Sequence, residues 1–170
     1  GTGIAYISAY DRRAVNSGLP GFGSIYAYNL NVSDPVLFKL TPQAGENYRP
    51  HGISLYTDPE RKDFLFVINH EGGTHTIEVY ELVGTLPYHT RSISDPLLVS
   101  PNDIVAVGPD RFYVTNDHHY ASGFMRTVED YLKLRLSNVL YYDGVRFTEA
   151  ADGIGFANGI NVSGDGKTLY

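Results

Sequence analysis

The sequence predicts an all-β fold: about half of a six-bladed β-propeller, roughly three blades, with one short helical insertion. Two observations lead to this prediction, a long repeat of strand-like segments and a composition rich in aromatic residues. The 170-residue chain contains 14 Tyr and 8 Phe but only one Met and no Trp. Aromatic and β-branched residues are enriched in strands, so this composition favours sheets over helices.

The repeat has three copies, each running from a polar residue through Gly or Asp to Ile, a short strand, an Asp-containing turn and an aromatic-rich strand. The copies are HGISLYTDPERKDFLFVINH (51–70), NDIVAVGPDRFYVTND (102–117) and NGINVSGDGKTLY (158–170). The opening GTGIAYISAYD fits the second half of the same unit. Aligned aromatic residues lie 60, 47 and 57 residues apart, at Tyr6, Phe66, Tyr113 and Tyr170. Periods of ~40–50 residues or a little more, with several strands each, are typical of propeller blades.

Between these copies the sequence predicts the outer strands of each blade. We expect strands at 24–30, 36–40, 75–82, 87–93, 138–144 and 145–150. The last two meet at Asp143-Gly144, a dipeptide favoured in tight hairpins. The segment 124–134 is the one expected helix, because its apolar residues roughly keep helical spacing. All the rest is expected to be strand and turn.

We expect one partial propeller domain over residues 1–170, truncated at both ends, because the chain begins and ends inside apparent strands. Six units of this spacing would need roughly 300–350 residues. A ring that cannot close leaves strand edges exposed. The isolated polypeptide should therefore be unstable or prone to aggregation.

Charge and composition argue against several partners. The formal net charge is -6 and there is no run of Lys or Arg, so nucleic acid and anionic membranes are not expected partners. No segment reaches the roughly 18 apolar residues that a membrane span needs. The absence of Cys excludes a disulfide or a thiolate metal site within this segment.

The first residues of the three copies are candidates for a shared metal site. The first strand of a propeller blade lines the central channel, so the repeat directs His51, Asn102-Asp103 and Asn158 toward one axis. Amide and carboxylate oxygens are the ligands that Ca²⁺ prefers, in sets of roughly six to eight. The alternative is that Asn and Asp merely begin turns at these positions.

Two histidines are candidates for a general base. His51 opens the first strand of its unit and His70 closes the second, so the antiparallel hairpin places them side by side. Such a pair can adjust one imidazole to accept a proton near neutral pH. The alternative is that one of them is a satisfied structural histidine.

The other histidines are expected to differ in role. His118 and His119 follow the second strand of the 102–117 copy, and we expect one of them to face the same cavity and the other to face solvent. His75 and His89 fall in outer-strand contexts and are interpreted as surface residues. Phe156 is either a wall of a pocket for an apolar substrate or a plain core aromatic residue.

Four of these segments resemble a known family. PHGIS, VINH, PNDIVAVGPDRFYVTNDHHY and FANGINVSGDGKTLY resemble the serum paraoxonase/arylesterase family, which are calcium-dependent lactonases with a six-bladed propeller. The resemblance runs along nearly the whole chain and is strongest at 50–120 and 156–170. It implies two calcium ions in the full-length protein, one catalytic and one structural, and it suggests a secreted protein.

The resemblance also implies a ligand set. Asn102 and Asn158 would be side-chain ligands of the catalytic Ca²⁺. Asp103 and the backbone carbonyl of Ile53 would bind the structural Ca²⁺. The family's further ligand pairs, Glu-Asp and Asp-Asn, would lie before and beyond this chain. Both sites would thus be incomplete in this segment, which alone should bind Ca²⁺ poorly and lack turnover.

For catalysis, the resemblance implies that His51 is the proton acceptor and His70 its partner, with His118 and Phe156 at the pocket wall. The leading hypothesis is therefore a calcium-dependent hydrolase that acts on a small-molecule lactone or aryl ester. One alternative is a non-catalytic propeller that keeps calcium for stability and binds a partner. Another is an enzyme similar to sugar lactonases, acting on polar aldonolactones.

Overall fold

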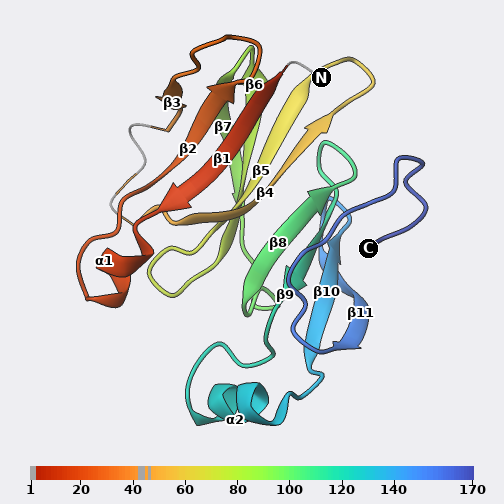
Figure 1. Cartoon of the computed structure of the whole chain (residues 1–170). Coiled ribbons are helices and arrows are strands. Elements are labelled where there is room, and N and C mark those ends of the chain that lie inside the picture. Colours follow the sequence, from red (N-terminus) through yellow and green to blue (C-terminus); the bar gives the residue numbers. More distant parts are fainter. Residues whose placement is uncertain (1–2, 42–44, 46) are drawn as a thin grey trace.

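The computed structural model describes residues 3–41, 45 and 47–170, which form three antiparallel sheets (Figure 1). The first sheet contains β1 (Ile4–Tyr10), β2 (Gly23–Asn29) and β3 (Leu37–Lys39). The second contains β4 (Pro50–Thr57), β5 (Asp63–Asn69), β6 (Thr76–Val83) and β7 (Leu86–Ile93). The third contains β8 (Pro101–Ala106), β9 (Phe112–Asn116), β10 (Ser137–Tyr142) and β11 (Phe147–Ile154). Strands follow chain order in every sheet, so the predicted all-β architecture is confirmed.

The predicted outer strands all form, with ends shifted by a few residues. The Asp143-Gly144 turn is present as well, because the Asp143 carboxylate accepts the backbone N–H groups of Val145 and Arg146 at 2.8 and 2.9 Å. The hairpin expected at 158–170 is reduced to one bridge between Val162 and Leu169.

Two helices interrupt the sheets among the described residues. The predicted one is α2 (Phe124–Leu132). The expectation that all the rest is strand and turn is wrong at α1 (Arg12–Asn16), where the Asp11 side chain accepts the backbone N–H of Ala14 at 2.9 Å and caps a short helix. No helix in the described part of the chain is long and apolar enough to cross a membrane.

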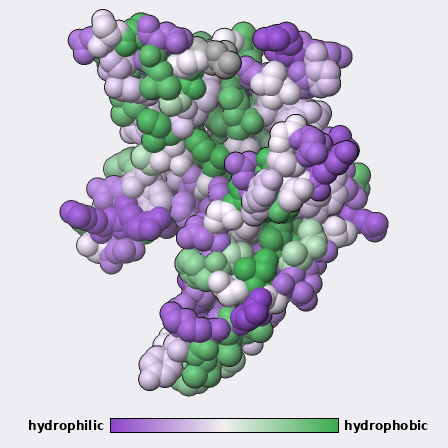
Figure 2. All heavy atoms as spheres, turned by 45° about the vertical axis from the view of Figure 1, so that its right-hand side comes forward, coloured by the Kyte–Doolittle hydropathy of each residue, from purple (hydrophilic) through white to green (hydrophobic). Residues whose placement is uncertain are grey.

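Helix α2 buries a carboxylate and exposes apolar side chains. Glu129 is 3% exposed, whereas Phe124 is 79% exposed and Leu132 59%. Hydrophobic residues accordingly reach the surface at the lower end of the molecule, where α2 lies (Figure 2). The helix is therefore placed by polar contacts of Glu129 rather than by an apolar face against the core.

The sheets pack face to face, and β5 is buried on both sides. Its residues alternate in direction, as strand geometry requires. Leu65 and Val67 pack toward the first sheet in a cluster that includes Ile25. Phe66 and Ile68 pack toward the third sheet, where Phe66 meets Phe112 with ring centroids 5.7 Å apart.

Strands β4 and β8, the first strands of the second and third sheets, share a local irregularity. In β4 the register shifts between Pro50, opposite Asn69, and Ile53, opposite Val67. In β8 it shifts between Pro101, opposite Asn116, and Ile104, opposite Val114. Each strand therefore carries a bulge of one extra residue at the same place in the repeat. Bulges redirect side chains and are common beside functional sites.

The two bulges meet at Gly52. A Cβ atom there would lie 2.6 Å from the carbonyl oxygen of Asn102 and 2.8 Å from the Cα of Asp103. The strands are joined further along by the Ser54 hydroxyl, which accepts the backbone N–H of Ala106 at 3.0 Å. On the other side, the Ser8 hydroxyl of β1 donates to the backbone carbonyl of His51. Only a residue without a side chain lets β4 approach β8 this closely.

We predict that Gly52→Ala lowers the free energy of unfolding by about 1–3 kcal/mol, because the added methyl group overlaps backbone that cannot rotate away. Gly164→Ala is the matched control, since a Cβ there meets nothing within 4 Å. Urea unfolding of both variants, made in the protein that contains this chain, measures the difference. Equal stability of the two variants would contradict the proposed close packing.

Candidate functional site

His51 and His70 lie side by side, as the hairpin argument predicted. His51 sits on the β4 bulge and His70 directly follows β5. Their closest ring nitrogens, Nδ1 of His51 and Nε2 of His70, are 3.0 Å apart, and the ring planes are tilted by 56°. One hydrogen must lie between these nitrogens, because each neutral imidazole has one donor and one acceptor.

Burial keeps both rings neutral. Desolvation, helped by the positive charge of Arg12, lowers the pKa of His51 below its ordinary value. For His70, desolvation and the neighbouring histidines lower the pKa to about 3. A neutral imidazole is the form that can accept a proton from water. The pair therefore has the protonation state that a general base requires at neutral pH.

The third sheet repeats this arrangement with different side chains. Asn102 occupies the β8 bulge and Asp117 directly follows β9, as His51 and His70 do in the second sheet. The Asn102 amide donates to Asp117 Oδ2 at 3.1 Å. The backbones match too, because His70 N donates to the carbonyl of Arg49 and Asp117 N to that of Ser100.

Asp117 is the site residue that the sequence interpretation passed over. The signal was present, because INH at 68–70 and TND at 115–117 place His70 and Asp117 in equivalent positions. Burial opposes ionisation of Asp117, but hydrogen bonds from Ser100 and His118 outweigh it and hold its pKa below the ordinary value. Asp117 is therefore a fixed negative charge close to the histidine pair.

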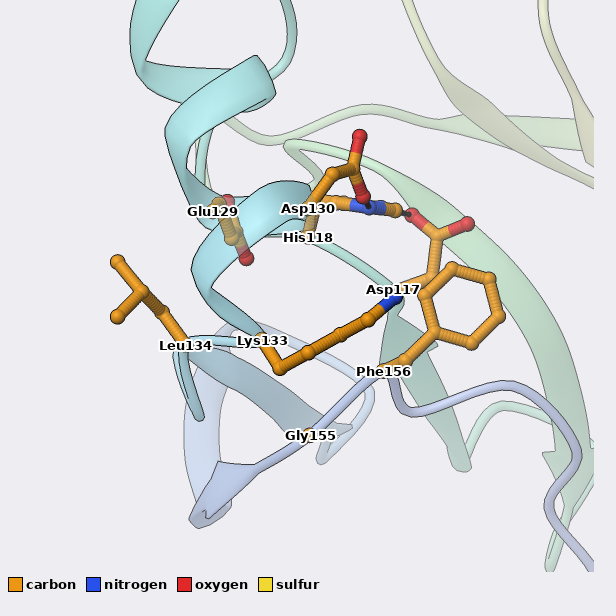
Figure 3. Close-up of a pocket in the computed structure, with 8 residues that line it drawn as sticks. All are labelled: Asp117, His118, Glu129, Asp130, Lys133, Leu134, Gly155 and Phe156. Atoms are coloured by element: carbon orange, nitrogen blue, oxygen red, sulfur yellow. Dashed lines mark hydrogen bonds and ion pairs between the residues drawn. The ribbon is translucent and has the colours of Figure 1, made fainter.

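His118 is buried between two carboxylates. Its Nδ1 lies 2.7 Å from Asp117 Oδ1, and its Nε2 lies 2.7 Å from Asp130 Oδ1 of α2 (Figure 3). Each ring nitrogen of His118 thus has a carboxylate oxygen within hydrogen-bond distance. The hydrogen bond from His118 in turn lowers the pKa of Asp130.

A cavity of about 290 Å³ opens beside His118, between α2 and the segment after β11. Phe156 meets the His118 ring edge-on, with centroids 5.2 Å apart. Figure 3 shows Phe156 and Lys133 on the side of the cavity next to Asp117. The loop that carries His118 is held to α2 by Glu129, which accepts the backbone N–H groups of His119 and Tyr120 at 2.9 and 3.2 Å. His118 and Phe156 thus share one cavity wall, and their role in substrate binding stays a prediction.

Asp103 and Asn158 lie together, although 55 residues separate them in the sequence. The Asp103 carboxylate accepts the backbone N–H of Ile160 at 3.0 Å, and Thr115 Oγ1 donates to the carbonyl of Asn158 at 2.9 Å. Ile53 follows Gly52, the residue that abuts Asp103. The start of the second repeat copy therefore contacts the starts of both the first and the third.

These residues offer oxygen atoms of the kind that a calcium ion binds. Asn102 donates through Nδ2, which leaves its amide oxygen as an acceptor, and Asp103 keeps lone pairs beyond the two backbone N–H groups that it accepts. The fit is one of ligand type, because the donors are oxygens from amide, carboxylate and backbone groups. Within the described ranges, no group of three or more His, Asp and Glu side chains could hold a metal ion.

Among the remaining histidines, the prediction is wrong for His75 and is confirmed for His89 and His119, which are exposed. The interpretation of His75 as a surface residue is wrong, because its half-buried ring lies against His70, with Nδ1 atoms 2.8 Å apart. His89, on the outer strand β7, lies 2.7 Å from Glu78 with its side chain 47% exposed. His119 is exposed and packs edge-on against Tyr120.

A family model and several curated proteins match this chain. A family model described as arylesterase matches residues 5–170. The chain is 39% identical to mouse serum paraoxonase/arylesterase 1 over 154 residues, covering 87% of this chain and 43% of that protein. It is 40% identical to human serum paraoxonase/arylesterase 2 over 153 residues, with the same coverage. It is 38% identical to chicken serum paraoxonase/arylesterase 2 over 178 residues, covering 99% of this chain and 49% of that protein.

The chain thus spans about half the length of the curated relatives that it matches. The match extends over the histidine pair, both bulges and the segment that carries Asn158. The resemblance noted from the sequence motifs is confirmed, and the chain belongs to the arylesterase family.

Proposed function

We propose that the protein containing this chain is a calcium-dependent hydrolase of lactones and aryl esters. The observation that carries the proposal is the neutral His51–His70 pair, which lies beside strand β8, where Asn102 and Asp103 offer oxygen ligands. A purely structural calcium site would give no reason for two coupled imidazoles next to it. The names of the relatives, which include arylesterase and paraoxonase, support the same reaction class.

In this reaction His51 accepts a proton from a water molecule as the water oxygen bonds to the ester carbonyl carbon. His70 holds the His51 ring in place through the 3.0 Å contact, and the charge of Asp117 favours the imidazolium that forms. The ester C–O bond then breaks, and the proton passes from His51 to the leaving oxygen. The product of a lactone is a hydroxy acid. General-base catalysis of this kind contributes roughly 10²–10⁴-fold.

Asn102, Asn158, Asp103 and the carbonyl of Ile53 would hold calcium in this proposal, in two sites. A bound Ca²⁺ supplies Lewis-acid stabilisation of the negative charge that develops on the carbonyl oxygen. His118 and Phe156 border the adjoining cavity, where an imidazole ring and an aromatic face can orient the acyl or leaving group.

The β-propeller architecture is part of the same proposal. Three sheets stacked face to face, with inner strands β4 and β8 in contact, are what roughly half of a six-bladed propeller would contain. On this reading the chain forms a single partial domain, and the bulges of its inner strands face the channel.

We predict that His51→Gln lowers kcat by roughly 10²–10⁴-fold on an aliphatic δ-lactone and on phenyl acetate, because the substitution removes the proton acceptor. His89→Gln, on the outer strand β7, is the matched control and should keep full activity. Unchanged turnover by His51→Gln with intact calcium content would reject the assignment of the base. Inactivity of the parent protein toward both substrates would favour a calcium-stabilised binding module instead.

The pH dependence of kcat/KM follows from the same residue. The pKa of His51 is lowered from its ordinary value of 6.5, so the neutral base persists as the pH falls through that value. We expect the acidic limb of the profile to lie below pH 6.5, with the rate falling only when His51 becomes protonated. Stopped-flow or steady-state rates from pH 4 to 9 measure it. An acidic limb above pH 6.5 would count against this environment for His51.

Removal of calcium tests the metal. Treatment with EGTA should reduce hydrolysis to background and lower the melting temperature, because an ion that binds only the folded state stabilises that state. Excess CaCl₂ should restore both, whereas MgCl₂ should not, since Mg²⁺ demands a tighter octahedral site. Full activity after exhaustive chelation would argue against calcium in this mechanism.

A further inference from the structure

The Ser137 side chain is a buried hydroxyl that joins the ends of three neighbouring strands. Ser137 is the first residue of β10 and is 1% exposed. Its hydroxyl donates to the backbone carbonyl of Asp117, which directly follows β9, at 2.6 Å. The same oxygen accepts the backbone N–H of Phe156, two residues beyond the end of β11, at 3.1 Å. Both directions are fixed, because a carbonyl can only accept a hydrogen bond and a backbone N–H can only donate one.

The backbone of Phe156 is strained. Its φ is 64°, in the left-handed region that a bulky side chain disfavours. Within the described ranges, Arg61 and Lys133 are the other residues besides glycine with a positive φ. Lys133 is the C-cap of α2, and helices commonly end in this conformation. Phe156 follows a strand instead, so its contacts must hold it in place, and strain of this kind is concentrated at functional sites.

The turn at Phe156 places its ring in the cavity beside His118. Gly155 and Phe156 both line this cavity of about 290 Å³, at the point where the chain leaves β11. In Figure 3 the Phe156 side chain extends from this segment toward Asp117 and His118. Its ring meets that of His118 edge-on, with centroids 5.2 Å apart, yet the residue stays 52% exposed. The aromatic ring is therefore open to a ligand rather than covered by the core.

The two hydrogen bonds of Ser137 act on both sides of this ring contact. The carbonyl that accepts from Ser137 belongs to the peptide group between Asp117 and His118. The N–H that donates to Ser137 belongs to Phe156 itself. One hydroxyl therefore fixes the backbone that carries the His118 ring and the backbone that carries the Phe156 ring. Its removal would leave a carbonyl and an N–H without these partners, which costs free energy where water cannot replace them.

We propose that Ser137 is a positioning residue that holds Phe156 in its left-handed conformation and thereby presents the Phe156 ring as a binding surface for aromatic substrates. This inference rests on the proposed function, because it places the aryl group of an ester in the cavity beside His118. An edge-to-face or offset-stacked contact with Phe156 favours an aromatic group over an aliphatic one by roughly 3–10-fold. Ser137 acts only through Phe156, since its own hydroxyl is engaged by the backbone.

Kinetics of the calcium-loaded full protein test this role. Ser137→Ala should raise KM for phenyl acetate roughly 3–10-fold, with kcat and the KM for an aliphatic δ-lactone close to the wild type. Ser137→Thr keeps a hydroxyl and should restore the low KM. Ser24→Ala is the matched control, because Ser24 is also fully buried and its hydroxyl bonds to Thr41 near the first sheet. Equal KM values for phenyl acetate in the wild type and Ser137→Ala would overturn the proposal.

A double-mutant cycle separates positioning from a general structural role. Phe156→Ala removes the ring and should itself raise KM for phenyl acetate. Because Ser137 acts through Phe156, Ser137→Ala should add no further increase in that background. The same increase in both backgrounds would show that Ser137 acts elsewhere and would overturn the proposal. Ser137→Cys, which has a similar volume but hydrogen-bonds weakly, is the test variant should Ser137→Ala fail to fold.

Binding without turnover distinguishes this inference from the proposed function. Saturation-transfer NMR with phenol and with cyclohexanol measures whether the resting protein prefers an aromatic ring. We expect phenol to bind more tightly than cyclohexanol in the wild type, and this preference to be lost in Ser137→Ala. If the protein hydrolyses no ester, the proposed function fails while the preference for phenol still responds to Ser137. If phenyl acetate is hydrolysed but neither its KM nor phenol binding responds to Ser137→Ala, the inference about Ser137 fails alone.

Discussion

The first strands of the second and third sheets, β4 and β8, approach each other most closely at Gly52, and this contact brings the candidate site residues of the two sheets together. The absence of a side chain there brings the bulge that carries His51 against the bulge that carries Asn102 and Asp103. Asp103 then reaches the segment beyond β11 by accepting the N–H of Ile160. One close approach thus gathers residues from three distant parts of the chain around a common point.

The two four-stranded sheets place different side chains at equivalent backbone positions. In both, a bulged residue on the first strand of the sheet meets the residue that directly follows the second strand. In the second sheet the two are imidazoles, with lowered pKa values. In the third sheet they are Asn102 and Asp117, joined by a hydrogen bond, and they are suited to cations and to holding charge. The repeat thus gives both sheets the same backbone geometry, and the side chains at these positions determine which chemistry each sheet can support.

Sequence alone could predict what depends on periodicity. Alternating apolar residues and repeat register predicted the strands, the all-β fold and the meeting of His51 with His70, because these follow from antiparallel pairing. The sequence did not predict the structural features that depend on a single local contact. Helix α1 forms because of one capping carboxylate, and His75 turns inward because Asn69 pairs with Thr76. The buried face of α2 could not be read from apolar spacing, since Glu129 rather than a leucine is covered.

Helix α2 forms part of the cavity wall yet belongs to no sheet. It lies between β9 and β10 and contributes Glu129, Asp130 and Lys133 to the space beside His118. Sequence changes in such an insertion leave the ladders and their apolar clusters untouched, because connecting segments tolerate substitution better than the strands that they join. Changes within this one short segment can therefore alter the lining of the cavity while the strands and their packing stay as they are.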